Sequence, residues 1–465
     1  MKQSFYQYNI NDNYNIKINV NKNPYDIELD NLFCMAARKN LKRKFLFVSK
    51  VLGKHVPIDP KIALLTGRLL SIKYIENIYG QKFELTNEIC DIINGGRYSQ
   101  EKYLQINKKR LDLPEETLII GFAETATALG HSFFDSFENN AFYLHTTRDI
   151  VMTPNDSISF EEEHSHATSH RLFPLKTSIL KSDAPIVFVD DEITTGKTTI
   201  NIIESIQKKY PRKRYCIVSI LDWRSKKDKE LFKQKEEELG IKIDTVSLIS
   251  GEIAYNNVNS EYFNEEEKNI DKSKTKDFSL EYIYLDNIFT DIVNSQSIDS
   301  NNNINTCCYL KHTGRFGIDN IDNEKLENLA NICGEKLKNM RTGSKTLCLG
   351  TEEFMYIPMK IATYMGVGIK YHSTTRSPIY ASKTQKYGVQ NKYTFKSPND
   401  NSVQNFVYNI PKNYYDDIFV FLEREGLDGS LESFIEAIKG TGVKKVYIVT
   451  HATSKRGDLV DRKQA

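Results

Sequence analysis

The sequence predicts two α/β domains, each built on a mostly parallel sheet covered by helices. Its 465 residues exceed what one hydrophobic core usually organises. Short apolar runs typical of buried strands, such as 117–121 and 186–189, alternate with amphipathic stretches of helical period. A polar, Asn-rich stretch in the middle of the chain interrupts this pattern. We therefore expect a first domain over 1–253, a linker region over 254–305 and a second domain over 306–465.

The composition narrows the class of protein. Lys and Arg number 63 against 61 Asp and Glu, so the net charge is only +2 and nucleic acid is disfavoured as the main ligand. The seven cysteines contain no CxxC pair, which argues against a disulfide framework or a zinc site. The first thirty residues lack an apolar core of signal-peptide length, and no apolar stretch reaches the length of a membrane span. We expect a cytoplasmic protein.

The two halves resemble each other. An apolar strand, a Glu and a later Thr-Thr-Arg occur in the first half at 117–121, Glu124 and 146–148, and in the second at 346–350, Glu353 and 374–376. A Thr-Gly-Arg triplet precedes each set, starting at Thr66 and Thr313. The common order suggests duplication of one α/β unit, with two unrelated α/β domains as the alternative.

The most informative segment runs from Ile186 to Thr199. An apolar strand ends in Asp190 and Asp191, and a Thr-Thr-Gly-Lys-Thr turn then opens a helix. Amides at a helix start bind phosphate, and Gly196 allows close approach of the backbone. The two acids can accept hydrogen bonds from vicinal sugar hydroxyls or hold water on Mg²⁺. The segment therefore predicts a sugar-phosphate site.

Two other structures share features with this segment. A nucleotide-triphosphate P-loop would also end in Gly-Lys-Thr, but it needs a glycine at position 191, which is Asp. An acidic turn that only caps a helix would not need paired acids together with a Gly-Lys turn.

Residues 189–198 resemble the phosphoribosyl-pyrophosphate (PRPP) loop of type I phosphoribosyltransferases of the orotate-transferase kind. Segments 43–55, 65–68, 121–127 and 161–168 resemble the phosphoribosyltransferases encoded with tellurium-resistance (Ter) stress genes, and the second half resembles the TRSP domain found behind them, through Thr-Arg-Ser-Pro at 375–378 and Arg-Phe-Gly at 315–317. The resemblance implies a type I phosphoribosyltransferase fold followed by a diverged phosphoribosyltransferase-like domain. It also implies that Asp190 and Asp191 hold the ribose hydroxyls, with Mg²⁺ as cofactor, and that the 5′-phosphate is bound by Thr194, Thr195, Gly196, Lys197 and Thr198.

A second loop follows the strand at 117–121. It consists mostly of small residues, so its amides can approach an anion closely. The resemblance makes it the pyrophosphate loop, where the leaving group gains charge, and a tight turn without a ligand is the alternative. The expected pyrophosphate-binding residues are Gly121, Phe122, Ala123, Glu124, Thr125, Ala126 and Thr127, together with Arg68.

Between the two loops, 160–171 occupies the position of the mobile flap of type I enzymes, which would exclude water from the reacting ribosyl centre. His164, His166 and Arg171 could then complement pyrophosphate charge or move a proton. A transition-metal site that also includes His170, or a solvated loop, is the alternative.

The basic N-terminal segment suggests a hood over the acceptor. Lys50, Lys54 and His55 could line an anion or acceptor pocket, although a solvated helix face or strand edge would show the same charges.

In the second half the acid pair is replaced by Leu422 and Glu423, and Asp428 in the following turn would repel a phosphate. We therefore expect this half to have lost PRPP binding and to bind an acceptor, a product or a partner enzyme, or to be purely structural. Its candidate residues are Arg315, Glu352, Glu353, Thr375, Arg376 and Ser377.

These observations favour an enzyme that transfers 5-phosphoribosyl from PRPP to a nitrogen of a base-like acceptor and releases pyrophosphate. The expected setting is a tellurium-resistance or stress-linked nucleoside pathway with other Ter-operon enzymes as partners, and a homodimer is possible by resemblance. The alternatives are a regulator that binds PRPP or a nucleotide without turnover, and a ligand-binding scaffold.

Overall fold

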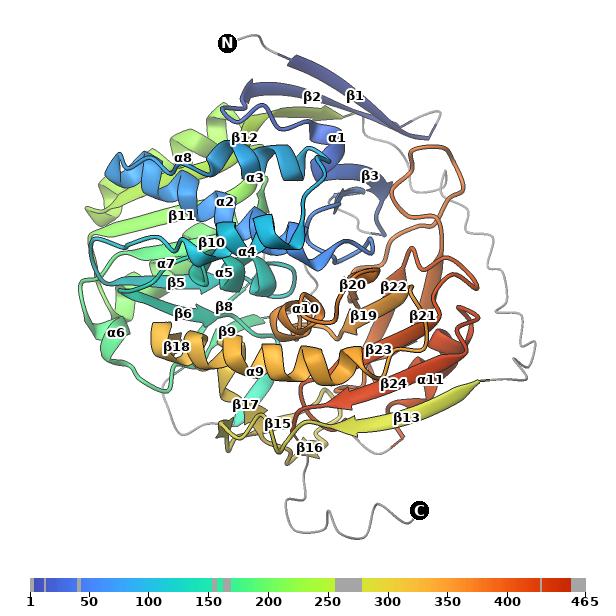
Figure 1. Ribbon diagram of the computed structural model, residues 1–465. Coiled ribbons are helices and arrows are strands. Elements are labelled where there is room, and N and C mark those ends of the chain that lie inside the picture. The colour runs from blue at the N-terminus through green and yellow to red at the C-terminus, as the bar shows by residue number, and fades with distance from the viewer. Residues whose placement is uncertain are drawn as a thin grey trace.

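The computed structural model describes residues 4–11, 14–39, 43–152, 157–161, 169–255, 278–426 and 429–452. Two sheets lie side by side, each flanked by helices (Figure 1). The larger is mostly parallel and the smaller entirely so. The α/β fold class predicted from the sequence is confirmed.

The larger sheet has eight strands. Its five central strands are parallel, and β1, β2 and β18 add antiparallel edges. In spatial order the strands are β1 (Ser4–Asn11), β2 (Tyr14–Lys22), β12 (Lys242–Tyr255), β11 (Arg214–Asp222), β10 (Ile186–Ile193), β5 (Thr117–Gly121), β6 (Ala141–His145) and β18 (Ile318–Asp319).

The smaller sheet repeats the order of these central strands. It runs β13 (Ser279–Tyr284), β24 (Lys445–Thr450), β23 (Asp417–Leu422), β19 (Thr346–Gly350) and β20 (Ile369–Ser373). The positions of β10, β5 and β6 are thus taken by β23, β19 and β20. Strand β13 comes from the segment expected to be a linker, and it is placed there by its pairing with β24.

Short strands complete the architecture. They form pairs or a triplet outside the two main sheets. These are β3 (Phe33–Ala37) with β4 (Phe45–Ser49), β8 (Ile158–Glu161) with β9 (Ser169–Leu172), β14 (Ile292–Val293) with β17 (Tyr309–Leu310), β21 (Lys392–Lys396) with β22 (Gln404–Tyr408), and β7 (Ile150–Met152) with β15 (Gln296–Ile298) and β16 (Ile304–Asn305).

The helices pack on the sheets and between them. They are α1 (Leu29–Leu32), α2 (Pro60–Tyr79), α3 (Thr86–Ile93), α4 (Gln100–Lys108), α5 (Ala126–Phe134), α6 (Ser178–Lys181), α7 (Lys197–Lys209), α8 (Lys226–Leu239), α9 (Asn320–Lys338), α10 (Tyr356–Ala362) and α11 (Glu432–Lys439). None of those in the described residues is long and apolar enough to cross a membrane.

Helices α2 and α9 each begin with a side-chain cap. Asp59 accepts a hydrogen bond from the Lys61 amide at 3.0 Å, and Pro60 occupies the first turn, where its missing N–H costs nothing. Asp319 caps α9 by accepting from the Asp322 amide, also at 3.0 Å. The caps fix where each helix starts, one residue after a short extended segment.

Those two extended segments cross between the halves. Ile58, just before α2, pairs antiparallel with Tyr371 of β20 in the smaller sheet, through bonds of 2.9 and 2.8 Å. Ile318, just before α9, pairs antiparallel with Tyr143 of β6 in the larger sheet. Each half therefore extends the edge of the other half's sheet, which ties the halves into one body.

Helices α5 and α10 form the centre of the contact between the halves, where Figure 1 shows them next to each other. Every residue of both helices is buried. The His131 ring stacks on that of Tyr356 with 3.6 Å between centroids. The Lys360 ammonium, also buried, lies 3.0 Å from the Asp135 carboxylate. Because α5 and α10 bury their apolar side chains in this contact, the two halves should resist separation.

Candidate active site

A cavity of about 460 Å³ opens where β10 and β5 end. Both predicted loops reach it, together with the hood and part of the second half. Its lining residues are Arg38 and Lys39, then Arg43, Leu46 and His55 of the hood (43–55), Phe122 to Thr125 and Arg148, Asp190 to Gly196 with Thr198 and Thr199, and Thr375 to Pro378 with Val403 and Gln404.

Strand β10 runs to Ile193 and so carries the acid pair, and a glycine turn leads from it to α7. Asp190 and Asp191 lie half-buried at the strand end and line the cavity. Gly196 has a φ of +75°, and a Cβ there would lie 2.5 Å from the Phe232 ring, so only glycine fits. Helix α7 then starts at Lys197. Backbone amides at a helix start, backed by the helix dipole, can form an anion site.

Burial and mutual repulsion make the acid pair harder to ionise than ordinary aspartates. Burial, and then the neighbouring Asp191, raise the pKa of Asp190 well above its ordinary value. Burial also raises the pKa of Asp191, and of Glu192, which pairs with Arg43 of the hood. Donors or a cation brought by a ligand would relieve this repulsion.

The loop after β5 places Phe122 to Thr125 on the cavity. Gly121 lies just below, and a Cβ there would meet the Tyr143 hydroxyl at 2.8 Å. The expected pyrophosphate residues Ala126 and Thr127 are not among the lining residues because they lie inside α5.

Glu124 in this loop is an anchor between the halves. Its Oε2 lies 3.1 Å from the Lys54 Nζ and accepts from the Thr375 hydroxyl at 3.2 Å and the Arg376 amide at 3.4 Å. Although burial alone would raise it, Lys54 and the arginines Arg148 and Arg376 lower the pKa of Glu124 to about 2. The carboxylate is therefore ionised at neutral pH.

Several expected site residues lie elsewhere. Arg68 is buried in α2, with its guanidinium over the Phe83 ring at 5.4 Å, and it does not line the cavity. Lys50 donates to the Asp30 carbonyl at 2.6 Å. Lys54 is held by Glu124 and by the Thr374 carbonyl at 2.8 Å, so it joins the halves and does not line the pocket. Lys197 is exposed outside it.

Residues of the expected flap are described only in part. His164 and His166 lie outside the described residues. Arg171 is on β9, where its backbone pairs with Thr147 and its side chain donates to the Arg148 carbonyl. It lines a second, polar cavity of about 200 Å³, which shares Arg148 and Arg376 with the first. His170 is buried with its Nδ1 2.9 Å from the Thr146 hydroxyl, and the described residues hold no group of three or more side chains arranged to bind a metal ion.

The corresponding place in the second half is filled. Only about 20 Å³ remains between Thr351–Phe354 and Leu422–Arg424, roughly the room of one water. The guanidinium of Arg315 fills most of this place and lines the space that remains, with its nitrogens 2.6 Å from Glu353 and 2.8 Å from Glu423.

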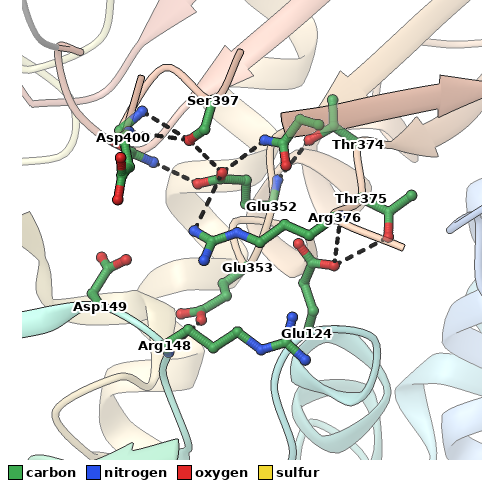
Figure 2. A network of polar contacts seen from close by, with 12 residues as sticks. Glu124, Arg148, Asp149, Glu352, Glu353, Thr374, Thr375, Arg376, Ser397 and Asp400 are labelled. Carbon is green, nitrogen blue, oxygen red and sulfur yellow. Dashed lines mark hydrogen bonds and ion pairs between the residues drawn. The ribbon is translucent and has the colours of Figure 1, made fainter. Parts of the chain in front are cut away.

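The contacts across the two halves are reciprocal. Glu353 accepts from the Thr147 hydroxyl at 2.6 Å and the Arg148 amide at 2.7 Å, as Glu124 does from Thr375 and Arg376. Figure 2 shows the bonds from Glu124 to Thr375 and Arg376. The Arg376 guanidinium lies 3.4 Å from the Glu352 carboxylate.

The basic partners correspond as well: Lys54 faces Glu124, and Arg315 faces Glu353. The preceding glycines, Gly53 and Gly314, sit against Tyr371 and Tyr143. The equivalence of the triplets at Thr66 and Thr313 was therefore wrong, because Gly53-Lys54 and not Gly67-Arg68 has the surroundings of Gly314-Arg315.

Sequence reasoning missed part of the lining. Arg148 belongs to the repeated Thr-Thr-Arg motif, so the sequence marks it as notable, but the motif alone does not place it in the cavity. Arg38 and Lys39 belong to the basic region before the predicted hood. Val403 and Gln404 carry no signal, because only the tertiary fold brings β22 and the turn before it to the cavity.

Comparison with protein families decides the class of both halves. Residues 32–252 match the family model described as phosphoribosyl transferase, and residues 312–438 match the TRSP domain found C-terminal to that family. The chain is a phosphoribosyl transferase domain joined to a TRSP domain. The predicted family and the predicted class of enzyme, a phosphoribosyltransferase, are confirmed at this level.

Solved structures similar to this chain include several adenine phosphoribosyltransferases and a hypoxanthine phosphoribosyltransferase. That of Trypanosoma brucei, in complex with AMP, pyrophosphate and ribose-5-phosphate, is 10% identical, with 53% of this chain and 87% of that chain covered and a TM-score of 0.31. That of Rhodothermus marinus is 13% identical, with 47% and 95% covered and a TM-score of 0.26. That of Leishmania donovani is 14% identical, with 38% and 68% covered and a TM-score of 0.22. No curated protein sequence matched the chain.

Proposed function

We propose that the chain transfers 5-phosphoribosyl from PRPP to a ring nitrogen of a base-like acceptor and releases pyrophosphate. The observation that carries this proposal is the meeting of Asp190, Asp191, the Gly196 turn and the Phe122–Thr125 loop in one cavity. A sugar phosphate activated at its anomeric carbon has three groups to bind: a terminal phosphate, vicinal hydroxyls and a leaving pyrophosphate. The cavity offers a distinct set of partners for each.

Each set has a physical role. Amides at the start of α7 and the hydroxyls of Thr194, Thr195 and Thr198 would bind the 5′-phosphate. Asp190 and Asp191 would accept hydrogen bonds from the ribose hydroxyls, which orients C1 toward the acceptor. Backbone amides of the loop after β5 would bind pyrophosphate oxygens as they gain charge.

The bond changes are simple. The C1–O bond to pyrophosphate breaks, a C1–N bond to the acceptor forms, and the acceptor nitrogen loses its proton. Mg²⁺ prefers carboxylate and phosphate oxygens and keeps several waters, so Asp190 and Asp191 fit it together with PRPP. When bound, it supplies positive charge to the pyrophosphate.

The biological setting is also a proposal. The TRSP domain and the segments that resemble Ter-encoded enzymes support a role in a tellurium-resistance or stress-linked nucleoside pathway in the cytoplasm.

Pyrophosphate release tests the proposed function. The full chain is incubated with PRPP and Mg²⁺ and a panel of free bases that includes adenine, hypoxanthine, uracil and orotate. We expect release of one pyrophosphate for each nucleotide formed with at least one base. If PRPP binds but no base causes release, the chain is a PRPP-binding regulator and the transferase proposal fails.

A further inference from the structure

His55, Ser377 and Glu124 are among the cavity-lining residues that have a buried polar atom without a hydrogen-bond partner. Neither ring nitrogen of His55 has a hydrogen-bond partner among the described residues, and the same holds for Ser377 Oγ and Glu124 Oε1. His55 is 6% exposed and Glu124 7%. All three residues line the 460 Å³ cavity. Buried polar groups are usually satisfied, so three exceptions facing one cavity indicate a ligand that completes them.

These groups form one wall. The Thr375 hydroxyl donates to Glu124 and accepts from the Ser377 amide at 3.1 Å. The Tyr408 hydroxyl donates to the Ser377 carbonyl at 2.7 Å, and its ring lies 6.1 Å from that of His55. His55 and Glu124 come from the phosphoribosyl transferase domain and Ser377 from the TRSP domain, so the wall spans both.

The wall offers mostly neutral hydrogen-bonding groups. Burial, and then the charge of Lys54, lower the pKa of His55 to about 3, and His372, Glu124 and Arg38 also face it. A neutral imidazole presents one N–H donor and one acceptor nitrogen. The Ser377 hydroxyl can do either, and the ionised Glu124 Oε1 only accepts. The negative charge of Glu124 is balanced by Lys54 at 3.1 Å.

We propose that His55, Ser377 and Glu124 form the subsite that reads the acceptor, and that the acceptor is an uncharged nitrogen heterocycle with a donor and an acceptor on one edge. This inference rests on the proposed function and extends it. The free carboxylate oxygen favours an N–H group on the acceptor and disfavours a ring that bears a carboxylate. The TRSP domain thereby takes part in choosing the substrate.

Calorimetry on the full chain tests the subsite. Adenine, hypoxanthine, uracil and the carboxylate-bearing orotate are each titrated into chain saturated with ribose 5-phosphate, pyrophosphate and Mg²⁺, so that no turnover occurs. We expect at least one uncharged base to bind. His55→Phe replaces the imidazole with an apolar aromatic ring and so removes both hydrogen-bonding groups. Ser377→Ala removes the hydroxyl. Each should weaken that binding about tenfold while PRPP affinity stays within about twofold, since one lost hydrogen bond in a buried site has this size.

The controls separate recognition from folding. His55→Gln restores a donor and an acceptor and should recover part of the affinity. Ser382→Ala, whose hydroxyl contacts only Thr384 and its amide, should change nothing. Because His55 lacks partners in the free chain, His55→Phe should not lower the unfolding temperature, whereas loss of a structural histidine would.

The outcomes distinguish this inference from the proposed function. Suppose that PRPP binds normally. The subsite is then refuted if orotate is the only base that binds, if no base binds, or if both variants bind an uncharged base as tightly as the unmodified chain does. In each of these cases the transferase proposal stands. If PRPP itself does not bind, the proposed function fails, and this inference with it.

Discussion

Replacing Asp190 and Asp191 with asparagine is expected to abolish PRPP binding without destabilising the chain. Each carboxylate would accept a charge-assisted hydrogen bond worth about 1.5–3 kcal/mol from a ribose hydroxyl, so loss of both should weaken binding at least a hundredfold. The free chain should unfold at the same or a higher temperature, because burial and mutual repulsion raise the pKa of both acids. Calorimetry with PRPP and thermal unfolding measure the two effects.

The stability gain has a predictable pH dependence. An acid whose pKa is raised in the folded state penalises folding once the pH exceeds its ordinary value, which is 3.8 for Asp190. The advantage of the asparagine variant should therefore be absent below pH 3.8, grow as the pH rises from 3.8 toward the raised pKa, and be full only above that raised pKa.

Asp244→Asn is the matched control. Asp244 is half-exposed on β12, 3.8 Å from Lys242, and lies off the cavity. This variant should bind PRPP normally. Unchanged PRPP affinity in the asparagine variant of the acid pair would contradict the site assignment.

Arg315→Ala should cause a large loss of stability. Arg315 is almost fully buried and pairs with Glu353 at 2.6 Å and Glu423 at 2.8 Å, with Asp149 at 3.6 Å. Removing one partner of a buried ion pair leaves uncompensated charge, which costs about 3–5 kcal/mol. Denaturant unfolding should show this loss, and the contact between the domains should open first, because Glu353 also bonds Thr147 and Arg148.

Two further variants test the cause. Adding Glu353→Gln and Glu423→Gln to Arg315→Ala should recover part of the stability, because fewer buried charges are left unpaired. Arg214→Ala removes an exposed pair with Glu115 and should cost less than about 1 kcal/mol. A loss from Arg315→Ala as small as that from Arg214→Ala would contradict the structural role of the cluster.

The sequence allowed prediction of what is local along the chain. The strand end at Asp190, the turn at Gly196 and the helix after it are contiguous, so strand period, turn chemistry and anion-binding geometry could be combined without knowing the fold. The loop after β5 was predicted for the same reason, although the part that reaches the cavity ends at Thr125 because α5 starts at the next residue.

What depends on tertiary contact could not be predicted. The approach of Ser377 and Gln404 to the first domain's cavity is set by the packing of α5 on α10 and by the exchanged edges at Ile58 and Ile318. Arg68 was expected among the pyrophosphate-binding residues, but the packing of α2 keeps its side chain away from the cavity. The guanidinium of Arg68 packs on the Phe83 ring, while Lys54, expected in the pocket, makes the ion pair with Glu124 in the contact between the domains.

The stoichiometry of PRPP binding tests the central claim most directly. The first domain keeps an open, acid-paired cavity, whereas Arg315 fills its counterpart in the TRSP domain. Titration of PRPP with Mg²⁺ into the full chain should give one site per chain, and that site should disappear in the asparagine variant of Asp190 and Asp191. Two sites per chain, or one site that survives this variant, would contradict the account.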